Sequence, residues 1–258
     1  MPIATQAADT TGEDRFSKVP EVTLVFWIIK VFCTTLGETG GDAVTMSMNL
    51  GYLVGTAIFA ALFLVFVVAQ VKAKGFQPFL YWTTIIATTT VGTTMADFAD
   101  RSLGIGYAGG SLSLLCLLLA SLGIWRWTMG SVSIKTVSTP KVEMFYWVTI
   151  MFSQTLGTAL GDWTADSEGI GYLGGAVIFG SLLAAVAACH FWTRIPKTVL
   201  FWTAFILTRP LGAVVGDFLD KPLAHGGLNL SRYTASATLT VLVIACILTF
   251  PKRAEKAN

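Results

Sequence analysis

Pairs of acidic residues recur along the chain at a spacing that places two carboxylates on one face of a helix. The pairs are Glu38/Asp42, Asp97/Asp100, Asp162/Asp166 and Asp217/Asp220. Like charges three or four residues apart repel each other on a helix, so a cation or a proton is needed to offset them. Carboxylate oxygens are ligands that Mg²⁺, Ca²⁺ and Mn²⁺ prefer. The pairs therefore indicate a binding site for a hard divalent cation.

One acid of each pair belongs to an internal repeat. The repeated landmarks, separated by 55, 65 and 55 residues, are Asp42, Asp97, Asp162 and Asp217, together with Trp27, Trp82, Trp147 and Trp202 and with Gly37, Gly92, Gly157 and Gly212. A fixed period kept in register predicts copies of one supersecondary unit. The predicted division is a polar cytoplasmic tail (1–20), repeats at 21–75, 76–130, 141–195 and 196–251, and a basic cytoplasmic tail (252–258).

The composition is typical of a membrane protein. The 258 residues are 54% hydrophobic and 12% charged, with a mean hydropathy of +0.69, whereas soluble domains average about 25% charged residues. A net charge of +2 offers no concentrated basic face, so nucleic acid is excluded as a partner. One span needs about 20 apolar residues. We therefore expect an all-α polytopic protein with eight transmembrane helices in a lipid bilayer.

Each copy is predicted to form two helices, which together return the chain to the side of the membrane on which the copy begins. The helices that end at the repeated aspartate are expected at 22–44, 79–99, 143–165 and 198–219, and the helices that follow at 50–71, 105–127, 170–192 and 230–250. Basic residues concentrate in the tails and between the copies, which places both termini in the cytoplasm. The four hairpins then share one orientation, around a pseudosymmetry axis along the membrane normal.

The acids are assigned two roles. The expected ion-binding and metal-ligating residues are Glu38, Asp42, Asp97, Asp162 and Asp217. The expected outer ring, for access or release of the ion, is Asp100, Asp166 and Asp220, which could instead be solvated turn residues or helix N-caps.

Two basic residues lie within the predicted first helices of the repeats. Arg209 is expected to be an internal counter-charge paired with Asp162 or Asp97, because an unpaired charge at that depth is untenable. Lys30 lies nearer the cytoplasmic end, where its side chain is expected to reach the membrane surface.

These features favour a transporter of a hard divalent cation, with Mn²⁺ preferred and proton coupling a possible addition. No tightly bound cofactor is expected, and the sequence carries no HExxH, GxSxG or P-loop motif, so an enzyme is the less favoured class. Three alternatives remain open. They are a transporter of a small organic cation that uses aromatic faces such as Trp163, a membrane enzyme, and a structural protein whose acids pair internally. A homodimer is compatible with any of them.

The segments TLGETGGD, TVGTTMADFADR, TLGTALGDWTAD and PLGAVVGDFLDK share a G-x-x-x-[GA]-D core. A chain with four such copies resembles a bacterial integral-membrane family known only as a tandem repeat of unknown function. The resemblance extends over residues 22–250 and implies an inner-membrane location and an eight-helix fold, but no activity. The fourth copy departs from the pattern, with Pro210 in its first helix and no Gly-Tyr at the start of its second.

Overall fold

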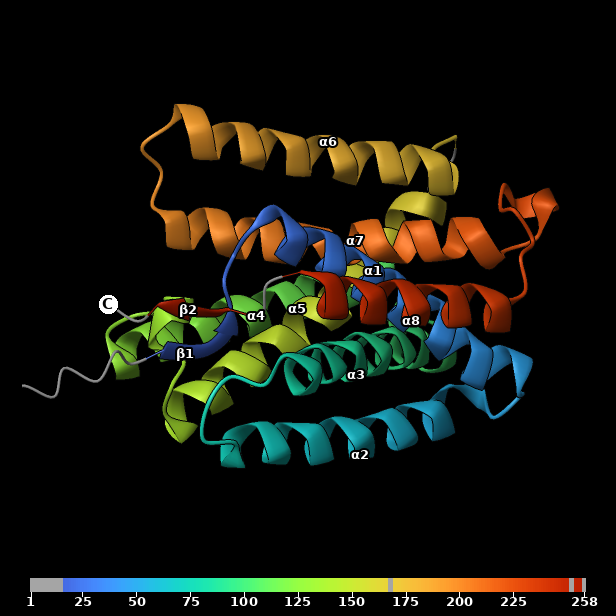
Figure 1. Ribbon diagram of the computed structural model, residues 1–258. Helices are drawn as coiled ribbons and strands as arrows, with labels where there is room; N and C mark the ends of the chain where they lie inside the picture. The colour runs from blue at the N-terminus through green and yellow to red at the C-terminus, as the bar shows by residue number, and fades with distance from the viewer. Residues whose placement is uncertain (1–15, 167–168, 251–252, 257–258) are drawn as a thin grey trace, which may run out of the picture.

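The computed structural model describes residues 16–166, 169–250 and 253–256, and most of them are helical (Figure 1). The long helices of this part of the chain are α1 (Leu24–Asp42), α2 (Gly51–Lys72), α3 (Pro78–Asp97), α4 (Tyr107–Met129), α5 (Pro140–Asp166), α6 (Gly171–Trp192), α7 (Lys197–Asp220) and α8 (Arg232–Thr249). Two short strands, β1 (Phe16–Pro20) and β2 (Ala254–Lys256), pair antiparallel at one end of the helices. The predicted all-α class is confirmed.

The first helices of the four repeats form the interior. These inner helices, α1, α3, α5 and α7, contact one another in a closed cycle, in that order. Each outer helix packs against the inner helix of the following repeat: α2 against α3, α4 against α5, α6 against α7, and α8 against α1 (Figure 1). Neighbouring repeats are therefore interlocked.

Repeated glycines allow the inner helices to approach closely. The facing pairs, from each inner helix to the next, are Gly37–Thr89, Gly92–Gln154, Gly157–Arg209 and Gly212–Thr34. A Cβ added at any of these glycines would crowd the facing residue, which is the use of small residues in close helix packing within lipid. The partners are themselves related by the repeat offsets, so equivalent positions lie at one level around the cycle.

Apolar side chains cover the outside of the molecule. Five helices, α2, α4, α6, α7 and α8, are long and apolar enough to cross a membrane. Large hydrophobic residues are exposed along the outer helices, for example Leu64 and Val65 on α2 and Leu173 and Val177 on α6. Exposed apolar surface of this extent indicates contact with lipid, so the chain has the character of a membrane protein. The helices α1, α3 and α5 are less apolar because their polar side chains face the interior.

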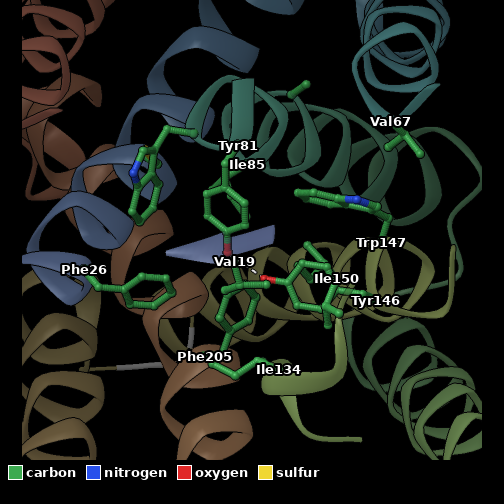
Figure 2. Close-up of a cluster of buried hydrophobic side chains, with 14 of the residues drawn as sticks. Val19, Phe26, Val67, Tyr81, Ile85, Ile134, Tyr146, Trp147, Ile150 and Phe205 are labelled. Atoms are coloured by element: carbon green, nitrogen blue, oxygen red, sulfur yellow. Dashed lines mark hydrogen bonds between the residues drawn. The ribbon is translucent and has the colours of Figure 1, made fainter. Parts of the chain in front are cut away.

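The end that carries the two strands, called here the tail end, is closed by β1. Lys18 donates its backbone N–H to Val137 O at 2.8 Å, and its ammonium lies 2.6 Å from a carboxylate oxygen of Glu143. The next residue, Val19, is fully buried in the same hydrophobic cluster as Tyr81 and Tyr146. Figure 2 shows these side chains, with the 2.6 Å hydrogen bond between the two tyrosine hydroxyls dashed. Residues 1–15 of the predicted tail lie outside the described residues.

Candidate ion site

Each inner helix carries one buried stripe of residues four apart, and the four stripes form five layers. From the tail end, the layers are Phe26/Tyr81/Tyr146/Phe201, Lys30/Ile85/Ile150/Phe205, Thr34/Thr89/Gln154/Arg209, Glu38/Thr93/Thr158/Ala213 and Asp42/Asp97/Asp162/Asp217. Residues at i and i+4 stack on one face of a helix. The stripes therefore change from aromatic residues at the tail end to four aspartates at the opposite end, called here the acidic end.

Four carboxylates of the last two layers, those of Glu38, Asp42, Asp162 and Asp217, converge with that of Asp220, whereas the predicted ligand Asp97 is not part of this convergence. Glu38, Asp162 and Asp217 each place an oxygen within 4.8 Å of the others, and Asp42, Asp217 and Asp220 do the same. All five side chains are buried. Asp217 belongs to both groups, so the groups form one continuous acid cluster from three inner helices.

Arg209 links all four inner helices just below the aspartates. Its Nη2 lies 2.9 Å from Glu38 on α1 and donates to the hydroxyls of Thr93 on α3, at 2.5 Å, and of Thr158 on α5, at 2.6 Å. The expected counter-charge is therefore present, but its partner is Glu38 and not Asp162 or Asp97. The backbone of Arg209 lies two helical turns below the aspartate layer. Its side chain reaches the layer of Glu38, one turn above, but not the aspartates.

Three further basic side chains, which lie between or at the start of the long helices, reach the carboxylates at the acidic end. Lys221 Nζ lies 2.5 Å from Asp42 Oδ2 and 3.1 Å from Asp217 Oδ1. Arg101 Nε lies 2.9 Å from Asp97, and its Nη2 lies 3.6 Å from Asp162.

Arg232 completes the set, with its Nε 3.0 Å from Asp220 Oδ2. Sequence reasoning missed all three roles. A signal existed for two of them, because Arg101 and Lys221 each follow a repeated aspartate by four residues.

The carboxylates hold these loop cations in the charged form. Burial disfavours the protonated form of Lys221, but Asp217 and Asp42 outweigh it and raise the pKa of Lys221. Burial acts the same way on Arg101, and Asp97 and Asp162 again raise its pKa. Both side chains therefore remain cationic at any physiological pH.

Several buried carboxylate oxygens at the acidic end have no hydrogen-bond donor. Among the described residues, Asp42 Oδ1, Asp97 Oδ2, Asp162 Oδ1 and Asp220 Oδ1 are buried and accept no hydrogen bond. In each case the other oxygen of the same carboxylate lies near a basic side chain. A buried carboxylate oxygen without a donor is costly, so these atoms are able to accept a cation or a proton.

The other two predicted outer acids lie apart from the cluster. Asp100 is half-buried and faces Gly110 on α4, and burial raises its pKa while Arg101 opposes the rise. Asp166 is exposed and accepts a hydrogen bond from the Tyr107 hydroxyl at 2.5 Å. Of the predicted outer ring, only Asp220 is brought into contact with the other acids.

The structure also places two residues away from their predicted surroundings. Lys30 does not reach the membrane surface: it is fully buried, with Nζ 4.3 Å from the centre of the Phe205 ring. Trp163 is exposed and lines an apolar surface cleft with Leu112 and Leu160.

Comparison with known proteins agrees with the repeat found in the sequence. The four stretches 25–76, 80–131, 145–195 and 200–256 match the family described as Repeat of Unknown Function (DUF347). No curated protein and no solved structure gives a significant match. The matched stretches correspond to the four repeats and include every residue of the acid cluster and the basic side chains that contact it. The chain therefore belongs to the DUF347 repeat family.

Proposed function

We propose that the chain crosses a bacterial inner membrane eight times, with both termini in the cytoplasm. The five apolar helices are accompanied by α1, α3 and α5, whose polar faces are turned toward one another and need no contact with lipid. The basic linkers favour a cytoplasmic tail end, and the acidic end then faces outward. In this arrangement the four repeats surround an axis along the membrane normal.

We further propose that the protein transports a hard divalent cation, with Mn²⁺ favoured, and that protons are its counter-ions. The observation that carries this proposal is the acid cluster, in which two groups of three carboxylates come within 4.8 Å and retain buried oxygens without donors. Oxygen ligands of this kind suit Mn²⁺, Mg²⁺ and Ca²⁺ better than Zn²⁺. Carboxylates placed inside a membrane protein mark an ion path by default.

The charge balance supports a divalent ligand. The six carboxylates at the acidic end (Glu38, Asp42, Asp97, Asp162, Asp217 and Asp220) face four basic side chains (Arg101, Arg209, Lys221 and Arg232). Full ionisation leaves two negative charges, which one divalent cation or two protons would neutralise. Protons and the metal ion would therefore compete for the same oxygens, and this competition is the basis of the proposed coupling.

The Lys221 ammonium is the group that an incoming metal ion must displace. It lies between Asp42 and Asp217, which are two of the three carboxylates of the outer group. Lys221 lies just after the end of α7, and its withdrawal would expose both oxygens to the outside. In the described state it acts as a tethered cation in the site.

The test is the thermal stability of the purified protein in Mn²⁺, Mg²⁺, Ca²⁺ or Zn²⁺, and in organic amines, over a range of pH. A ligand that binds only the folded state at 100 times its Kd stabilises it by about 2.7 kcal/mol. We expect Mn²⁺ to stabilise the wild type and to stabilise Lys221→Met more strongly, because the competing ammonium is gone. Manganese uptake into proteoliposomes should follow the same order.

The matched control pair lies on α5. Asp162→Asn removes a carboxylate of the cluster and should abolish the Mn²⁺ response, whereas Asp166→Asn removes an exposed acid one turn away and should leave it intact. Loss of the response in both variants, or in neither, would contradict the proposed site.

The second candidate function is structural, with the acids neutralised internally. The four basic side chains favour it, because each lies within 3.1 Å of at least one carboxylate. This candidate predicts that neither the wild type nor Lys221→Met responds to any metal ion or amine. It also predicts that Lys221→Met lowers the stability and that no added cation restores it.

A further inference from the structure

Lys30 is the buried cation that the acid cluster does not explain. It lies in the second layer from the tail end, three layers below the aspartates, and its side chain is fully buried. Its Nζ lies over the face of the Phe205 ring, 4.3 Å from the ring centre, but has no hydrogen-bond partner among the residues that the structure describes. An unpaired charge in such a place is strongly disfavoured, so a protonated Lys30 requires a counter-charge.

Two side chains in the layer above Lys30 also have polar atoms without partners. Arg209 uses Nη2 for Glu38 and the threonines, while its Nε and Nη1 make no hydrogen bond within the described part of the chain. Gln154, at the equivalent position of α5, has both amide atoms buried and unbonded. Lysine and arginine are donors only, and glutamine adds two more N–H groups. The ligand that suits this set is an acceptor.

The charges and dimensions restrict that ligand further. Lys30 and Arg209 carry two positive charges, and the carboxylate of Glu38 balances one of them. Adjacent layers are one helical step of four residues apart, about 6 Å. The aromatic layer with its Tyr81–Tyr146 hydrogen bond lies below, and the bonded guanidinium of Arg209 lies above. One small ion with a single negative charge would balance the remaining positive charge.

We propose that Lys30, Gln154 and Arg209 bind a small inorganic monovalent anion of the size of chloride. The Lys30 ammonium supplies the charge, and the N–H groups of Gln154 and Arg209 supply further donors. This site is separate from the acid cluster and does not depend on metal transport, although Arg209 contacts both.

The experiment replaces gluconate with chloride at constant ionic strength and records the Tm of the detergent-purified protein. Gluconate is too large for the proposed site, so we expect the wild type to show a saturable rise in Tm with chloride. Lys30→Ile should lose the rise without loss of folding, because Ile85 and Ile150 already occupy this layer in two other repeats. Lys30→Arg, which keeps the charge, should retain the rise.

Two outcomes would overturn the proposal: a wild type indifferent to chloride, which would mean that Lys30 is buried neutral, or a Lys30→Ile variant that still responds. Gln154→Leu should weaken the chloride response. Asp162→Asn should leave it intact, which separates this site from the proposed metal site. In crystals grown with bromide, an anomalous peak should lie beside Lys30 Nζ, and a peak only at the molecular surface would also refute the assignment.

Discussion

Replacement of Arg209 by methionine tests the central contact of the inner helices. The change removes hydrogen bonds to three other helices and leaves the carboxylate of Glu38 buried without its cation. Loss of one partner of a buried ion pair costs about 3–5 kcal/mol. For a protein of this size, 1 kcal/mol corresponds to about 2–4 °C in Tm, so Arg209→Met should lower the Tm by about 6–20 °C.

The double variant Arg209→Met/Glu38→Gln separates the ion pair from simple loss of packing. With both charges removed, no buried carboxylate lacks its cation, and neutral replacement of a buried pair often costs little. We therefore expect the double variant to recover most of the Tm lost by Arg209→Met. Intrinsic fluorescence is a suitable measurement, since the chain has 8 tryptophans.

The control is Arg126→Met, because Arg126 is exposed near the end of α4 and bonds only the backbone of Gly130 among the described residues. Its replacement should change the stability by less than about 0.5 kcal/mol. The reasoning fails if Arg209→Met is as stable as the wild type. It also fails if the two single changes add in the double variant, because additivity means that the two residues do not interact.

Four further variants test the packing, the tail end and the acidic end. Gly212→Ala should lose about 1–3 kcal/mol by crowding the backbone of α1, whereas Gly123→Ala, which has open space, should gain up to about 1 kcal/mol in thermal unfolding. Glu143→Gln should weaken the hold on Lys18 and make β1 sensitive to protease. The raised pKa of Lys221 means that its stabilising contribution is complete below pH 10.5 and is lost only as pH rises through the higher folded-state value. Alkaline titration should therefore show the wild type more stable than Lys221→Met at and beyond pH 10.5.

The repeat allowed much of the interior to be predicted from sequence. Identical offsets for Gly37 and its equivalents predicted close helix contacts, and the same offsets predicted that aspartates from different copies would meet. Asp42 and Asp217 do meet, at the outer group of the acid cluster. Periodicity identifies equivalent positions well, because it is a property of the chain alone.

The partners of the charges could not be predicted in the same way. Lys221 and Arg232 lie in or beside a loop, and their ion pairs depend on how that loop folds over α1. The prediction that Lys30 reaches the membrane surface was wrong. It was made because a lysine near a helix end usually extends toward water, and only the packing of α7 against α1 shows that its side chain is enclosed. The interlocking of the repeats was also hidden, because most outer helices are adjacent in sequence to an inner helix on either side, and sequence order alone does not decide which of the two they pack against.

That interlocking bears on how such a molecule could have arisen. A chain with two repeats would end in an outer helix that packs, in the present protein, against the inner helix of the next repeat. Its first inner helix would in turn have no outer helix packed against it. A second identical chain supplies both missing neighbours at once. Two short proteins would thus close the same cycle as a symmetric pair, and gene duplication followed by fusion would yield the present architecture without any change in its contacts.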